Sequence, residues 1–135
     1  NDLLDGEGDD DTAYGGNGND TLLGDSDPGG QVAGADRLFG GNGNDVLRGD
    51  GGGDTLDGGA GRDGLTGGAG ADVLTGGANG DWFVFLSTAD SRNPPALRDR
   101  ITDFDSGSDR IDMLNFTDGR ATFIGGAVFS GAGYE

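Results

Sequence analysis

Apolar residues recur at intervals of nine positions along the first two thirds of the chain. Residues 40–75 read GGNGNDVLR, GDGGGDTLD, GGAGRDGLT and GGAGADVLT, with leucine at the eighth place of each repeat. A period of nine puts successive leucines on opposite faces of a helix, so the pattern argues against a helix and favours short strands. The eighth place stays apolar in the flanking repeats as well, and the full set is Leu4, Ala13, Leu22, Leu38, Leu47, Leu56, Leu65, Leu74 and Phe83.

Each repeat divides into a turn and a strand. The last three places, such as Val46-Leu47-Arg48, predict a short strand whose middle residue points inward. The first six places are rich in glycine and predict a turn. Two turns and two strands make one coil, so residues eighteen positions apart should lie one strand spacing apart, about 4.8 Å. The sequence therefore predicts an all-β protein with a parallel β-roll over residues 1–85.

Aspartate at the sixth place supplies the candidate chemistry. Carboxylates stacked at one strand spacing repel each other unless a divalent cation lies between them. Calcium accepts about 6–8 oxygen ligands, and glycine in the turns lets backbone carbonyls converge. The stacked pairs predict about seven calcium sites. The expected ligand residues are Asp2, Asp20, Asp45, Asp63 and Asp81 on one edge, Asp11, Asp36, Asp54 and Asp72 on the other, and the turn glycines Gly16, Gly18, Gly41, Gly43, Gly59, Gly61, Gly68, Gly70 and Gly77.

The order G-G-x-G-x-D-x-U-x resembles the calcium-binding nonapeptide of RTX proteins. Two repeats depart from it. Residues 6–14 (GEGDDDTAY) have Asp9 at a glycine place and Ala13 at the inward place. Residues 24–39 carry seven extra residues, and we interpret these as a tolerated surface loop, with a contact to a partner as the alternative.

Composition narrows the possible functions. The chain has 135 residues, 32 glycines and a net charge of −17, so we expect that it does not fold to a compact state without an additional stabilising factor. It has no cysteine and no histidine, which excludes disulfides and disfavours zinc, thiol and histidine-based catalysis, so we expect no enzyme activity. The negative charge disfavours nucleic acid, and no apolar run reaches the roughly 20 residues of a membrane span. Asn1 falls at the fifth place of a repeat, which suggests a fragment of a longer protein.

The pattern changes after residue 85. Segments at 100–104, 110–114 and 121–124 alternate or cluster as strands do, so we expect residues 86–135 to form a β region that caps the roll. Residues 76–85 together with the stretch Asp99 to Met113 resemble the C-terminal domain of serralysin-type secreted metalloproteases, and the R-modules of mannuronan epimerases are similar. This resemblance implies a parallel β-roll with a β-sandwich-like cap, seven or eight calcium ions and no catalysis of its own.

The resemblance also implies one further calcium ion held by Asp90 and Asp99. Asp90 lies eighteen residues after Asp72, where the next ligand on that edge is expected. An N-terminal catalytic or effector domain and the type I secretion machinery are the implied partners, and the implied location is extracellular. Two alternative functions stay open: a polysaccharide-binding module, which requires arginines gathered on one face, and a structural segment of an S-layer protein or adhesin.

Overall fold

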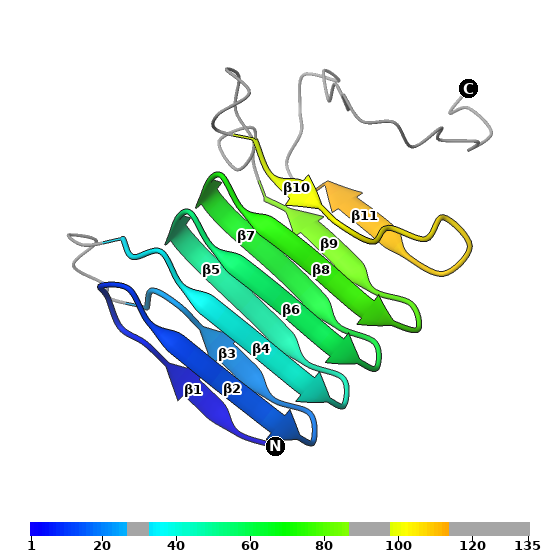
Figure 1. The fold of residues 1–135 in the computed structure, drawn as a ribbon, viewed down its shortest axis with the longest axis horizontal. Coiled ribbons are helices and arrows are strands. Elements are labelled where there is room, and N and C mark those ends of the chain that lie inside the picture. Colours follow the sequence, from blue (N-terminus) through cyan, green and yellow to red (C-terminus); the bar gives the residue numbers. More distant parts are fainter. Residues whose placement is uncertain (27–32, 87–97, 114–135) are drawn as a thin grey trace.

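The structure is a computed structural model that describes residues 1–26, 33–86 and 98–113. Within these ranges the chain forms eleven strands and no helix, and the strands wind into a flattened coil (Figure 1). The strands are β1 Leu3–Asp5, β2 Thr12–Asn17, β3 Thr21–Leu23, β4 Arg37–Asn42, β5 Val46–Gly52, β6 Thr55–Ala60, β7 Gly64–Gly70, β8 Val73–Ala78, β9 Trp82–Phe85, β10 Arg100–Ile101 and β11 Arg110–Met113.

Alternate strands build two separate sheets. One has the order β1-β3-β5-β7-β9-β11 and the other the order β10-β8-β6-β4-β2. Every pairing is parallel, and within the regular repeats partners are eighteen positions apart, as in Leu47 with Leu65. The seven extra residues widen this spacing once on each sheet, as in Leu22 with Leu47. The predicted all-β parallel roll is confirmed.

The strands are longer than the three residues that the sequence predicts. β5 and β7 each have seven residues, because the first places of a repeat continue the ladder of the strand before it. Gly41, for example, is aligned with Gly59 one coil further on. Identical turns stacked in register can pair through their backbones. The turns are therefore shorter than the six residues that the sequence predicts.

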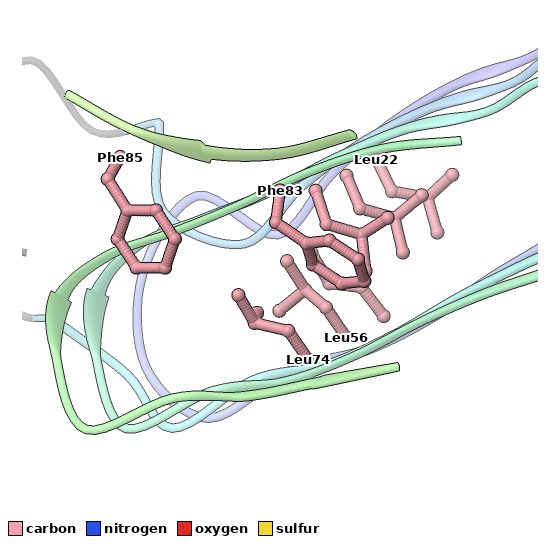
Figure 2. Close-up of a cluster of buried hydrophobic side chains, with 8 residues drawn as sticks. Leu22, Leu56, Leu74, Phe83 and Phe85 are labelled. Carbon is pink, nitrogen blue, oxygen red and sulfur yellow. The ribbon is translucent and has the colours of Figure 1, made fainter. Parts of the chain in front are cut away.

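The space between the two sheets is filled by the residues at the eighth place. Leucines 22, 38, 47, 56, 65 and 74 and Phe83 are all completely buried, and Figure 2 shows them stacked as a ladder between the sheets. Burial of each such side chain contributes roughly 1.5–3 kcal/mol. Leu4 and Ala13 also point inward but are only partly buried, because they belong to the first coil and are covered on one side.

The two sheets continue beyond residue 85. β10 pairs with β8, and β11 pairs with β9, both in parallel. Ile101, Phe104 and Ile111 pack against the core, and the ring of Phe104 lies 6.1 Å from that of Phe83. The expected strand at 121–124, and most of the expected cap over 86–135, lie outside the described residues, so the sandwich-like cap stays a prediction.

Candidate metal centre

The turns that join the sheets lie along two edges of the roll. We call the turns at 6–11, 49–54 and 67–72, together with the described residues 24–26 and 33–36, the first edge, and the turns at 15–20, 40–45, 58–63 and 76–81 the second edge. The aspartate at the sixth place ends each turn and points into the roll. Aspartates 20, 36, 45, 54, 63, 72 and 81 are each only 1% exposed, as deeply buried as the leucines that follow two residues later.

These aspartates form a hydrogen-bonded ladder along each edge. The backbone N–H of Asp45 donates to Oδ1 of Asp63, one coil further on, at 2.8 Å. The same hydrogen bond joins all seven stacked pairs that the sequence predicts. It also occurs once more on each edge, after the last predicted pair. The complete set is Asp2 to Asp20, Asp20 to Asp45, Asp45 to Asp63, Asp63 to Asp81 and Asp81 to Asp109, and Asp11 to Asp36, Asp36 to Asp54, Asp54 to Asp72 and Asp72 to Asp99.

The second carboxylate oxygen has a different environment. Oδ2 is buried and accepts no hydrogen bond from the part of the chain that the structure describes in Asp11, Asp20, Asp36, Asp45, Asp54, Asp63 and Asp81. A buried carboxylate oxygen without a donor is costly, by roughly 1–3 kcal/mol or more. A bound cation would supply the partner that such an oxygen lacks among the described residues.

The oxygens converge in places that only glycine leaves open. A Cβ placed on Gly40 would lie 2.5 Å from Oδ2 of Asp45 and 2.6 Å from the carbonyl oxygen of Gly58 on the next coil. Gly58 is equivalent, with Oδ2 of Asp63 at 2.6 Å and the carbonyl of Gly76 at 2.7 Å. The first glycine of each repeat is therefore required because carboxylate and carbonyl oxygens approach its Cα.

The glycines at the second and fourth places of the turns share a positive φ. All nine glycines proposed as ligands from the sequence have positive φ, from +93° at Gly16 to +157° at Gly70. In the stacked turns a Cβ on Gly41 or Gly43 would collide with the carbonyl oxygen of Gly16 or Gly18 on the preceding coil. The carbonyls of these places thus form columns along each edge. Their role as calcium ligands stays a prediction.

This set of oxygens fits a hard cation. Within the described residues no three Asp, Glu, His or Cys side chains converge on one point, so a cation at these turns would be held by carboxylates in pairs together with backbone carbonyls. Calcium tolerates such mixed, flexible oxygen shells better than magnesium, which demands a small octahedral one. When bound, the cation supplies positive charge between carboxylates that otherwise repel.

Burial makes the charged form of several of these aspartates unfavourable. It raises the pKa of Asp54 to about 7 and that of Asp63 to about 6, with the charges of neighbouring carboxylates adding to the shift. The pKa values of Asp36 and Asp81 are raised for the same main reason. At neutral pH without metal, these sites hold charge that the protein interior disfavours.

The end of each ladder differs from the expectation drawn from spacing. On the first edge Asp99, not a residue eighteen positions after Asp72, accepts the amide of Asp72 at 3.1 Å. Asp90 lies outside the described residues, so its role as a ligand stays a prediction. On the second edge Asp109 accepts the amide of Asp81 at 3.0 Å and was missed. Its signal is the order Asp-Arg-Ile, in which an apolar residue follows two places after aspartate as in every repeat.

The parallel roll, with a ladder of aspartates and glycine-rich turns on both edges, places the chain in the class of RTX-type β-roll proteins. The model of the peptidase M10 serralysin C-terminal family matches residues 10–135, and the chain belongs to this family. The family is an RTX-type, calcium-binding and non-catalytic C-terminal part of serralysin-type proteases. No curated protein matches the chain.

Two further features concern partners. The described arginines are divided between the faces: Arg37 and Arg100 lie on one sheet, Arg48 and Arg110 on the other, Arg62 in a turn, and Arg98 just before β10. They do not gather on a single face, as the polysaccharide-binding alternative requires. No helix in the described segments is long and apolar enough to cross a membrane.

Proposed function

We propose that this chain is a calcium-dependent folding module of a larger secreted protein. It stays loosely structured at the low calcium concentration of the cytosol, passes through a type I secretion machinery, and folds in extracellular calcium. It has no catalysis of its own and is joined to an N-terminal catalytic or effector domain. About seven or eight calcium ions fill the turns of both edges and the end of the roll.

The observation that carries this proposal is the row of buried Oδ2 oxygens. Seven aspartates place such an oxygen where no described donor reaches it. The described part of the chain supplies these oxygens with no donor, which supports a partner that is not one of its own described groups. Membership of a calcium-binding family supports calcium as that partner.

The energy of binding is large enough to control folding. A site with Kd ten times below the external calcium concentration contributes about 1.4 kcal/mol. Seven such sites contribute on the order of 10 kcal/mol, which equals the whole net stability of an ordinary domain. About seven divalent ions would also offset most of the net charge of −17. Without them the carboxylates repel and the small leucine core is insufficient.

Circular dichroism and size-exclusion chromatography of the full chain test this proposal. In millimolar calcium we expect a strand spectrum and a compact elution volume, and after chelation an unfolded spectrum and an expanded chain. Magnesium at the same concentration is the matched control, and it should not restore the strands because it demands a small octahedral shell and loses its bound waters reluctantly. A chelated sample that stays compact with its strand signal intact would overturn the proposal.

A further inference from the structure

The roll ends on the second edge in a turn that lacks the repeat motif. Residues 102–109 join β10 to β11 and pack on the last regular turn at 76–81. The amide of Thr102 donates to the carbonyl of Leu74 at 2.9 Å, and the hydroxyls of Thr75 and Thr102 are 2.8 Å apart. These contacts bring Asp103 to the position one coil beyond Gly76, which is the first place of a repeat.

In the regular turns this first place is always glycine, and its backbone carbonyl approaches Oδ2 of the aspartate on the preceding coil. In the final turn this place is occupied by Asp103, which has a side-chain carboxylate in addition to its backbone carbonyl. Both oxygens of Asp103 are held in place, because Oδ1 accepts the amide of Gly76 at 3.0 Å and Oδ2 accepts the amide of Gly77 at 2.7 Å. The side chain is therefore fixed against the last regular turn.

Burial raises the pKa of Asp81, and the charges of Asp109 and Asp103 add to the shift, so Asp103 lies close enough to Asp81 for its charge to act there. Asp81 is 1% exposed, and its Oδ2 has no hydrogen-bond partner among the described residues. Its backbone N–H is held by Oδ1 of Asp109 at 3.0 Å, as in every step of the ladder. The turn around it keeps the conformation of the other turns, with positive φ at Gly77 and Asn79. The carbonyl of Ser108 lies against Gly80, so the final turn is seated directly on this one.

We propose that Asp81 and Asp103 form a further cation site that closes the second edge, with Asp109 as the residue that positions Asp81. It rests on the proposed function, since it assumes that the turns bind calcium. It differs from the repeat sites in its ligands, because Asp103 adds a side-chain carboxylate at a place that is glycine in the regular turns. The additional negative charge favours a hard divalent or trivalent cation.

Asp103→Asn tests the site, because asparagine removes the charge and keeps one oxygen for the Gly76 amide, at the cost of the acceptor for the Gly77 amide. Asp112→Asn is the matched control, as Asp112 is an exposed residue of the neighbouring strand β11. Calcium titration calorimetry should count about one ion fewer for Asp103→Asn and no change for Asp112→Asn. Circular dichroism in saturating calcium checks that both variants keep the roll.

A second measurement uses terbium alone in place of calcium. Trp82 is the single tryptophan, follows Asp81 directly and is aligned with Arg110, so it can sensitise terbium luminescence at this end of the roll. The tryptophan-sensitised emission should fall in Asp103→Asn and stay unchanged in Asp112→Asn. An unchanged ion count together with unchanged emission would overturn the site.

Anomalous scattering from crystals of the unaltered chain grown with terbium locates the ions even if Asp103→Asn fails to fold. An ion within ligand distance of both Asp81 and Asp103 supports the inference. Ions in the repeat turns without one here would overturn the inference and leave the proposed function intact. Ions at neither place would overturn both.

Discussion

The two edges of the roll have the same backbone plan but different residues. On the second edge the second place of every regular turn is glycine: Gly16, Gly41, Gly59 and Gly77. On the first edge the same place is occupied by Glu7, Asp25, Asp50 and Gly68. Glu7 and Asp50 adopt φ of 75° and 65°, a region that costs a side chain of this kind about 1–2 kcal/mol. At the second place the first edge therefore carries backbone strain that the second edge avoids, although Asn79 at a fourth place of the second edge also has a positive φ of 86°.

The two edges also differ at the fifth place, where the second edge has a ladder of hydrogen bonds to uncharged asparagine side chains. At the fifth place of the second edge, Asn19, Asn44 and Arg62 donate their backbone N–H groups to the side-chain oxygens of Asn1, Asn19 and Asn44 at 2.8–2.9 Å. The first edge has an acid in the equivalent position, since Asp10 accepts the amide of Ala35 at 2.8 Å. We infer that the second edge is better formed before calcium binds, and that the first edge depends more on the cations.

Exchanging the second-place residue should have the largest effect where the glycine is stacked on the turn of a preceding coil. Gly41→Asp copies the first edge onto the second, but its φ is +104° and its Cβ would collide with the carbonyl of Gly16. We expect a loss of about 3 kcal/mol in the free energy of unfolding in saturating calcium, from strain and overlap together. Chemical denaturation measures it.

Gly16→Asp is the matched control for this exchange. It places the same residue at the same place of the same edge, and a Cβ there meets nothing within 4 Å. Its loss should be limited to the backbone cost, about 1–2 kcal/mol. Equal losses for the two variants would show that the stacked carbonyl is not what requires glycine.

Removing one buried charge on each edge should produce the next largest effect. Asp54→Asn on the first edge and Asp63→Asn on the second both delete a carboxylate whose pKa is raised, to about 7 and about 6. We expect each to raise the calcium concentration at the folding midpoint, by about tenfold for the affected sites. In calcium-free buffer we expect each variant to be more stable than the unaltered chain. The amide removes a buried charge, and its N–H can face the nearby carbonyl.

The difference between the edges predicts which of these variants gains more. Burial raises the pKa of Asp54 further than that of Asp63, to about 7 against about 6, and the charges of three neighbouring carboxylates add to the shift at each site. Asp54→Asn should therefore increase the calcium-free strand signal more than Asp63→Asn does. Circular dichroism during a calcium titration gives both quantities. A larger gain for Asp63→Asn would contradict the proposed difference between the edges.

The fold and much of the site follow from the sequence because the repeat is short and strict. Leucine at the eighth place predicts the core, and aspartate at the sixth predicts the stacked pairs, because both positions are fixed by the nine-residue period. The eighteen-residue spacing no longer predicts stacked partners where the nine-residue period ends. After Phe85 the spacing between coils rises from 18 to 27 and 28 positions, as in Asp72 with Asp99 and Asp81 with Asp109, so counting eighteen residues could not find either partner.

Acidity should partly replace calcium, with a smaller effect than the charge deletions. A folded-state pKa raised above its unfolded value means that protonation favours the folded state below the unfolded pKa, and that this stabilisation is lost as pH rises through the folded pKa. For Asp63 and Asp54 the loss should occur as pH rises through about 6 and then about 7. Calcium-free chain should therefore gain strand signal between pH 7.5 and pH 5.

The acid response is measured by circular dichroism in calcium-depleted buffer without chelator, because protons weaken chelators. The double variant Asp54→Asn with Asp63→Asn is the control and should respond less, since it no longer has these two groups to protonate. In saturating calcium the same change of pH should act in the opposite direction, because protons compete with the cation for the carboxylates. A calcium-free signal that does not change with pH would contradict the raised pKa values.

Asp50→Gly should have the smallest effect, and it completes the exchange between the edges. Glycine relieves the positive φ of 65° at this place, which should stabilise the folded state by about 1 kcal/mol. The exposed pair between Arg48 and Asp50, 3.0 Å apart, is lost, but such pairs contribute about 0–1 kcal/mol. We expect a net gain of a few tenths of a kcal/mol, measured by denaturation in saturating calcium at moderate salt, where the ion pair is screened. Asp112→Asn controls for the change in net charge. A clear loss of stability in Asp50→Gly would mean that the acid at this place contributes more through its charge than it costs in backbone strain.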